Sequence, residues 1–226
     1  MKTFFLFLSL IIVLISSCAK PIYNPKSPTY APIIEISTAF GNMDIQLFAA
    51  TPKHRDNFVK LIKEGYYDSL LFHRVINQFM VQGGDPNSKN AVAGAMLGNG
   101  GPGYTIDAEF VDSLLHFKGA LAAARMGDQV NPQKASSGSQ FYLVQANKIP
   151  ADRMQSLLAR SGIKYTEEQK KKYQEIGGTP HLDGAYTVFG QIINGLTVLD
   201  SIAKVPCNRA NRPNKDIRMK IRLKKG

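Results

Sequence analysis

The sequence predicts a mainly β domain, closed or sandwich-like, over residues 33–226. Short apolar and β-branched segments recur along this region, turn-forming residues separate them, and only two helical segments flank them. No internal repeat is visible in the sequence. The expected strands cover 33–37, 44–48, 70–76, 79–82, 119–125, 139–145, 186–193 and 217–224.

The first two strands are expected to form a hairpin, because glycine and asparagine in the predicted turn, residues 40–43, tolerate positive φ angles. A helix should follow. Thr51 is its expected N-cap, Pro52 fits its first turn, and Gly65 is a natural stop. A short second helix is expected over 196–203.

Residues 147–180 depart from the strand pattern and predict a helical insertion between strands. Apolar residues with helical spacing indicate a helix over 152–161. A capping-box pattern that begins at Thr166 indicates a second helix over 167–176.

The composition excludes several classes of protein. With 44% hydrophobic and 20% charged residues, the chain is neither disordered nor collagen-like nor a coiled coil. The net charge of +11 suggests nucleic acid or an anionic membrane surface as a candidate partner. However, residues 204–226 alone hold nine basic residues against one acid, a net +8. Nucleic-acid binding by the whole surface is therefore not expected, and the body of the domain is close to neutral.

The basic C-terminal segment alternates apolar and charged residues over 217–224. This period of two predicts a half-buried strand whose outer face is charged. An adhesion or nucleic-acid role for this segment is the less favoured alternative, and we expect no nucleic-acid partner.

The first eighteen residues predict an export signal. Lys2 precedes an apolar run over 4–15, twelve residues long, whereas a membrane-spanning helix needs ~20. The run ends in Ile15-Ser16-Ser17-Cys18, which resembles the lipobox of bacterial lipoproteins. We therefore expect residues 1–17 to be a signal peptide and Cys18 to be lipidated. An ordinary signal peptide with an incidental cysteine is the alternative.

Residues 18–32 contain four prolines and predict an extended tether. The expected location is the bacterial cell envelope, with the domain lipid-anchored and facing the periplasm. The outer membrane is favoured because Ala19 is not an acidic retention signal. If Cys18 is acylated, Cys207 has no partner within the chain, and no structural disulfide is expected.

Three segments carry the chemistry: FHRVINQFMVQGGD over 72–85, SGSQFYL over 137–143 and HLDGAYTVFG over 181–190. In this order they closely resemble the cyclophilin family of peptidyl-prolyl cis–trans isomerases. The resemblance covers about 33–146 and 179–224. It implies a closed eight-stranded antiparallel barrel capped by two helices, and a monomer that acts on proline-containing segments of unfolded or exported proteins.

The resemblance also assigns roles to individual residues. It implies that Arg74 is the catalytic cation and that Gln82 contacts the substrate backbone. Phe79, Met80, Tyr142 and Leu182 would line the proline pocket, Ala124 and Arg125 would lie along the bound peptide, Gln140 would support the site, and Tyr186 would stand at its rim.

The chemistry of such a site needs no cofactor or metal, and none is expected here. An X–Pro bond rotates over a barrier of ~18–20 kcal/mol that arises from amide resonance. Rotation is accelerated when a fixed cation stabilises the twisted amide, whose nitrogen regains a lone pair. The four histidines lack the spacing of metal ligands. The G-x-G-x-x-G match at 98–103 contains Pro102 and is expected to be a loop beside the site.

Some positions depart from the family pattern. Many members carry Trp at the position of His181, so cyclosporin sensitivity does not carry over from the resemblance. Many carry Asn at the position of Arg125, and the extra cation could favour acidic peptides. A non-catalytic proline-peptide-binding or chaperone lipoprotein is the alternative function, because the insertion at 147–180 could cover or extend the groove.

Overall fold

The computed structural model describes residues 29–159 and 161–224. The predicted signal peptide, the predicted lipidation site at Cys18 and residues 18–28 of the predicted tether lie outside the described residues. Within the described part of the chain, no helix is long and apolar enough to cross a membrane.

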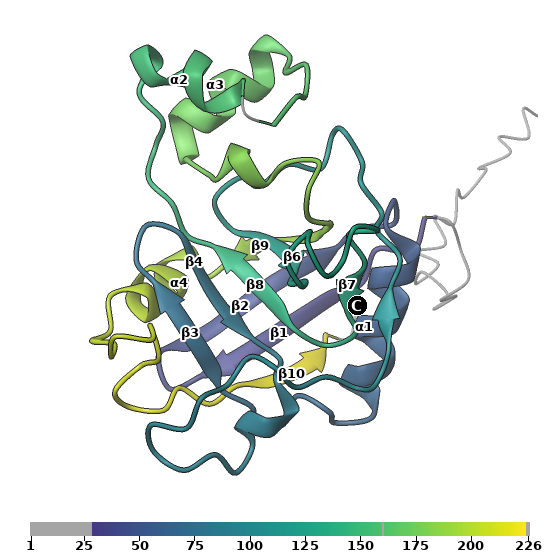
Figure 1. Ribbon diagram of the computed structural model, residues 1–226, viewed down its shortest axis with the longest axis vertical. Coiled ribbons are helices and arrows are strands. Elements are labelled where there is room, and N and C mark those ends of the chain that lie inside the picture. The colour runs from purple at the N-terminus through teal and green to yellow at the C-terminus, as the bar shows by residue number, and fades with distance from the viewer. Residues whose placement is uncertain (1–28, 160, 225–226) are drawn as a thin grey trace, which may run out of the picture.

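Eight strands form one curled, antiparallel sheet (Figure 1). In spatial order they are β10 (Lys220–Leu223), β1 (Ile33–Thr38), β2 (Gly41–Leu47), β9 (Val188–Asn194), β6 (Ala120–Ala123), β8 (Phe141–Val144), β4 (Met80–Gly83) and β3 (Phe72–Ile76). The short strands β5 (Thr105–Ile106) and β7 (Ser136–Ser137) pair separately. The eight strands expected from the sequence are thus confirmed, with different ends.

The prediction of a closed barrel was too strong. The strand order runs from β10 to β3, and among the described residues no ladder joins these two edge strands. Leu71 and Arg218, which precede the two edge strands, form an isolated bridge. The N–H of Phe72, the first residue of β3, donates to the Ile217 carbonyl at 2.9 Å. The last strand is short and begins only at Lys220, after the residues that approach β3. The sheet is therefore a half-barrel whose edges touch.

The first hairpin turns slightly earlier than the sequence predicted. Thr38 pairs with Gly41, so Ala39 and Phe40 form the turn, and Asn42 already belongs to β2. Gly41 has a φ of +121°, a conformation that residues with a side chain rarely adopt. Gly41 correctly indicated a turn, but it is the first residue of β2 and follows the two turn residues.

Four α-helices occur in the described residues: α1 (Pro52–Lys63), α2 (Ala151–Leu158), α3 (Glu167–Ile176) and α4 (Leu196–Ala203). Two 3₁₀ turns, η1 (Pro86–Ser88) and η2 (Pro180–Leu182), complete the elements. The predicted capping box of α3 is confirmed, because Thr166 and Gln169 exchange side-chain and backbone hydrogen bonds. The helix predicted over 152–161 ends earlier, at Leu158.

The N-terminus of α1 is capped by a residue that the sequence did not indicate. Thr51 occupies the N-cap position, but its side chain makes no capping hydrogen bond. Instead, the carboxylate of Glu109 accepts the backbone N–H groups of Lys53 and His54, each at 3.0 Å, and lies 2.7 Å from Nδ1 of His54. A carboxylate is favoured there because a helix N-terminus carries unpaired N–H donors and a partial positive charge.

The alternating side chains of the central strands build two apolar clusters on opposite faces of the sheet. On β8, Phe141 and Leu143 pack into the main core, together with Phe58 and Leu61 of α1. Tyr142 and Val144 point the other way, into a smaller cluster. The smaller cluster, which we call the outer cluster, comprises the buried residues Met80, Ala120, Ala122, Ala124, Tyr142, Val144, Ala146 and Val188, with partly buried side chains packed against them.

The segment 147–180 forms a third apolar cluster of its own. Helices α2 and α3 stand beyond the end of the sheet in Figure 1. Met154 and Leu158 of α2 and Tyr173 of α3 pack with Leu115 and Phe117. The segment thus rests on the chain that leads into β6.

The C-terminal alternation is confirmed. Ile217, Met219 and Ile221 are all buried, while Arg218 and Lys220 between them are exposed. Several basic side chains of this region are paired: Arg222 with Asp68, Lys224 with Asp44, and Arg212 with Asp216.

Candidate active site

The strand register places the predicted site residues in one row. Arg74 on β3 lies opposite Gln82 on β4, Gln82 lies opposite Tyr142 on β8, and Tyr142 lies opposite Ala122 on β6. Directly paired residues on neighbouring strands project to the same side of a sheet. The row therefore forms the face of the sheet that carries the outer cluster.

A chain of hydrogen bonds fixes the polar part of this row. Nη1 of Arg74 donates to Oε1 of Gln82 at 3.1 Å, and Nε2 of Gln82 donates to Oε1 of Gln140 at 3.1 Å. Nε2 of Gln140 in turn donates to the carbonyls of Gly98 and Gly100, both at 2.8 Å. Each amide is thereby oriented, and the guanidinium of Arg74 is held beside the outer cluster.

The predicted proline-pocket residues gather in the outer cluster. Met80 and Tyr142 are among its buried members, and Phe79 and Leu182 pack against it, partly exposed. Phe79 also stacks on His181, with ring centroids 5.8 Å apart and an interplanar angle of 23°. An apolar patch of this composition, next to a fixed arginine, suits a proline ring.

A groove of about 680 Å³ adjoins the cluster. Four predicted site residues line the groove: Gln82, Ala124, Arg125 and Gln140. The loop over 98–105 and the exposed side chains of Met126 and Val130 complete its walls. The lining residues all come from outside the segment 147–180. The helical segment therefore does not line this groove.

Arg125 does not offer an unpaired cation to a bound peptide. Its Nε donates to the carbonyl of Ala185 at 2.8 Å, and its Nη1 donates to the carboxylate of Asp128. The guanidinium carbon lies 4.4 Å from the centroid of the Tyr186 ring, a cation–π contact. Because Arg125 is already paired with the exposed Asp128, the structure does not single it out as a free cation for acidic peptides. It contacts Tyr186, the predicted rim residue, instead.

A buried polar chain behind the pocket was missed by the sequence reasoning. The hydroxyl of Tyr142 lies 2.9 Å from Nε2 of His116, and Nδ1 of His116 lies 2.8 Å from Oδ1 of Asp183. The other carboxylate oxygen of Asp183 accepts from the hydroxyls of Tyr165 at 2.7 Å and Tyr173 at 2.6 Å. Asp183 lies in the HLDG motif, which could have indicated a role for it in the site. His116 lies in an apolar stretch, where no motif indicates such a role.

The glycine-rich segment 98–103 is a loop, as expected. The carboxylate of Asp85 accepts the N–H of Asn87 at 2.8 Å and also the N–H of Gly98. A Cβ atom at Gly100 would come within 2.1 Å of Oδ1 of Asp85, so the loop closes tightly on this carboxylate. In the described residues, no group of three or more His, Cys, Asp or Glu side chains could hold a metal ion.

His73, next to Arg74, is buried. Burial disfavours the charged imidazolium and lowers the pKa of His73 from 6.5 to about 4. At neutral pH the ring is therefore uncharged, and Arg74 carries the positive charge of this part of the site.

The sequence and the fold of this chain match known proteins. A model of the family described as cyclophilin-type peptidyl-prolyl cis-trans isomerase/CLD matches residues 33–222. The chain belongs to the cyclophilin family. This places it in the enzyme class of peptidyl-prolyl cis–trans isomerases, as its sequence had indicated.

Curated relatives of the cyclophilin domain carry the same name. A predicted peptidyl-prolyl cis-trans isomerase of Staphylococcus saprophyticus is 42% identical over 178 residues, which cover 78% of this chain and 83% of the relative. Its counterpart in Staphylococcus aureus is 40% identical over 185 residues, covering 81% and 87%. A predicted bifunctional phosphatase/peptidyl-prolyl cis-trans isomerase of Streptococcus pyogenes is 40% identical over 189 residues, but the chain spans only 37% of its length.

Solved structures agree with the cyclophilin fold. The crystal structure of a cyclophilin-type isomerase from Cryptosporidium parvum has a TM-score of 0.65 and 26% identity, and the match covers 87% of this chain and 99% of that one. A crystal structure of the same protein in the presence of the dipeptide Ala-Pro has a TM-score of 0.64 and 25% identity, with coverages of 86% and 99%.

Proposed function

We propose that the chain accelerates rotation about X–Pro bonds by using Arg74 to stabilise the twisted amide of a proline held in the outer cluster. The observation that supports this most is the Arg74–Gln82–Gln140 chain, which orients a cation beside an apolar patch of Phe79 and Met80.

The proposed mechanism is electrostatic. As the X–Pro bond twists, amide resonance is lost and the proline nitrogen becomes a hydrogen-bond acceptor. An Arg74 guanidinium that donates to this nitrogen binds the twisted state better than either planar state, and this preference lowers the barrier. Each ~1.4 kcal/mol of preference raises the rate about tenfold.

The remaining predicted residues bind the substrate in this proposal. Gln82 contacts the peptide backbone, and Ala124 and Arg125 lie along the adjoining groove that takes the residues next to proline. Tyr142 and Leu182 complete the apolar wall. The Ala-Pro dipeptide named with the Cryptosporidium cyclophilin is consistent with a proline-containing ligand.

The activity is tested by measuring cis–trans interconversion of an X–Pro peptide with the full chain, beside its binding of the same peptide. Strong acceleration supports the isomerase. Tight binding of the peptide by the folded chain without acceleration would support the alternative, a proline-peptide-binding or chaperone lipoprotein.

We further propose that the protein works as a lipid-anchored monomer in a bacterial cell envelope, facing the periplasm and favouring the outer membrane. Proline isomerisation takes ~10–100 s without catalysis, so chains that fold after export would benefit from an isomerase held at the membrane. The support is the signal-like segment 1–17 with its lipobox and the proline-rich tether. Labelling with radioactive palmitate should mark the chain and should fail in a Cys18→Ala variant; label that persists in the variant would contradict lipidation at Cys18.

A further inference from the structure

We infer that the helical segment 147–180 positions Tyr142 in the proline pocket through a buried hydrogen-bond chain, in which Asp183 and His116 are the positioning residues. The inference rests on the proposed role of Tyr142 as part of the pocket wall. This hydrogen-bond chain connects the outer cluster with helix α3, two regions that do not line a common groove.

The central residues of this hydrogen-bond chain are buried. His116 and Tyr173 are fully buried, Asp183 is 2% exposed and Tyr142 is 5% exposed. Asp183 uses both carboxylate oxygens. Oδ1 accepts the backbone N–H of His116 at 2.8 Å as well as its Nδ1–H, and Oδ2 accepts the hydroxyls of Tyr165 and Tyr173. An acceptor with four donors in a dry interior holds all of them in place.

One arrangement of protons satisfies the whole chain. Because the carboxylate of Asp183 can only accept, Nδ1 of His116 carries a hydrogen. In the tautomer with a hydrogen on Nδ1 alone, Nε2 is an acceptor, and the hydroxyl of Tyr142 donates to it. Burial raises the pKa of the Tyr142 hydroxyl well above its usual value, so the hydroxyl keeps its hydrogen.

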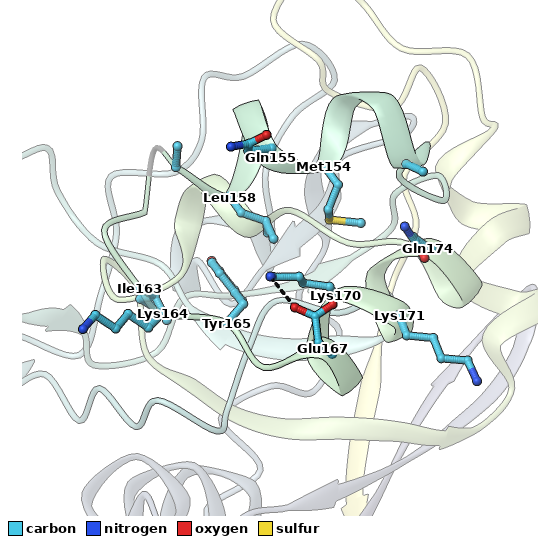
Figure 2. Close-up of a pocket in the computed structure, with 12 residues that line it drawn as sticks. Met154, Gln155, Leu158, Ile163, Lys164, Tyr165, Glu167, Lys170, Lys171 and Gln174 are labelled. Atoms are coloured by element: carbon cyan, nitrogen blue, oxygen red, sulfur yellow. Dashed lines mark hydrogen bonds and ion pairs between the residues drawn. The ribbon is translucent and has the colours of Figure 1, made fainter.

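The far end of the chain depends on the helical segment. Tyr173 belongs to α3, and its carbonyl accepts the N–H of Ile149 at 3.1 Å. Tyr165 lines a hollow of about 850 Å³ between α2 and α3, together with Met154 and Leu158 (Figure 2). Packing of the two helices therefore sets where the two hydroxyl donors meet Asp183.

At the other end of the hydrogen-bond chain, the contact with His116 orients the ring of Tyr142. This ring lies nearly parallel to the imidazole of His116, at an interplanar angle of 12°, and meets the ring of Tyr186 edge-on at 6.0 Å. Without the hydroxyl anchor, packing alone would fix the ring. Because a displaced wall ring contacts the proline less well in the ground state and the transition state alike, loosening the hydrogen-bond chain should weaken peptide binding.

The test is a double-mutant cycle in the full chain. Tyr173→Phe removes one donor to Asp183, and Tyr142→Phe keeps the pocket ring but removes the hydroxyl that the chain holds. The readouts are the Kd of an X–Pro peptide and the split between kcat and KM. We expect Tyr173→Phe alone to raise Kd and KM about threefold to tenfold with little change in kcat, and to have no further effect in the Tyr142→Phe background.

Controls separate positioning from general destabilisation. Ser156→Ala removes an exposed hydroxyl of α2 that donates to the Arg153 carbonyl, and it should leave Kd unchanged. Tyr165→Phe, at a half-buried site, gives a second variant if Tyr173→Phe does not fold. A Tyr173→Phe effect of equal size in both backgrounds, or a folded variant with unchanged Kd, overturns the inference. The Kd readout does not require turnover, so a failure of the proposed isomerase would be seen separately, as wild-type binding without acceleration.

Discussion

Nη1 of Arg74 donates to Oε1 of Gln82 at 3.1 Å across the β3–β4 pair, in which the two residues lie directly opposite each other. The backbone register thus brings the two predicted catalytic residues together, and side-chain contacts only refine the geometry. The second amide hydrogen bond of Gln82, to Gln140, keeps its oxygen pointed at the guanidinium. The pairing of β3 with β4 therefore sets the position of the Arg74 guanidinium.

We expect Gln82→Ala to lower kcat/KM for an X–Pro peptide about tenfold. The substitution removes the acceptor that orients Arg74, and hydrogen bonds to charged groups contribute ~1.5–3 kcal/mol. A matched control is Gln46→Ala on β2, which alters a half-exposed glutamine outside the site. Equal activity of the two variants in the same isomerisation assay would show that Gln82 does not orient the cation.

Gly84→Ala should destabilise the protein by roughly 2–4 kcal/mol. Gly84 has a φ of +91°, and an added Cβ would lie 2.2 Å from the carbonyl oxygen of Ser139. Gly127→Ala is the control, because a Cβ there meets nothing within 4 Å. Urea unfolding measures both variants; a Gly84→Ala protein as stable as Gly127→Ala would contradict the close approach of the two backbone segments.

Glu109→Gln should lower the free energy of unfolding by about 1–2 kcal/mol. The amide keeps the size of the side chain but loses the charge that faces the α1 N-terminus and one of its acceptor oxygens. Glu64→Gln, at the opposite end of the same helix and half exposed, should change stability by less than about 0.5 kcal/mol. If thermal and urea unfolding rank the two variants the other way, the carboxylate cap does not stabilise α1.

His73 should make the protein less stable as the pH falls from about 6.5 to about 4. In this window the unfolded chain binds a proton at this histidine and the folded chain does not, so stability decreases with decreasing pH. The shift from 6.5 to about 4 sets an upper limit of roughly 3 kcal/mol. Unfolding measured across this window should show a shallower pH dependence for His73→Leu, and identical slopes for both proteins would contradict the lowered pKa.

Much of the fold followed from local patterns. Alternation over 217–224 predicted which side chains of the last strand are buried, and the capping box at Thr166 predicted the start of α3. These features depend on neighbours two to four residues apart, which a sequence displays directly. The closure of the sheet depends instead on how Leu71 and Arg218 meet, and no local pattern encodes that distance.

The site was predicted from motifs in the same way, and its missing parts are non-local. Arg74, Gln82 and Gln140 were singled out from contiguous segments, and the structure brings them into contact. The pairing of His116 with Asp183 joins residues 67 positions apart. Outside the site, the cap of α1 by Glu109 likewise joins residues 55 positions apart. A buried polar pair of this kind is recognised only when both partners are placed in space.

The most direct test of the proposed mechanism compares Arg74→Ala and Arg74→Lys with the wild-type full chain, using one X–Pro peptide for both isomerisation and binding. If the guanidinium stabilises the twisted amide, kcat should fall at least about a hundredfold in Arg74→Ala and recover only partly in Arg74→Lys, while the Kd of the peptide stays within about threefold. A folded Arg74→Ala protein that retains wild-type kcat would contradict the account.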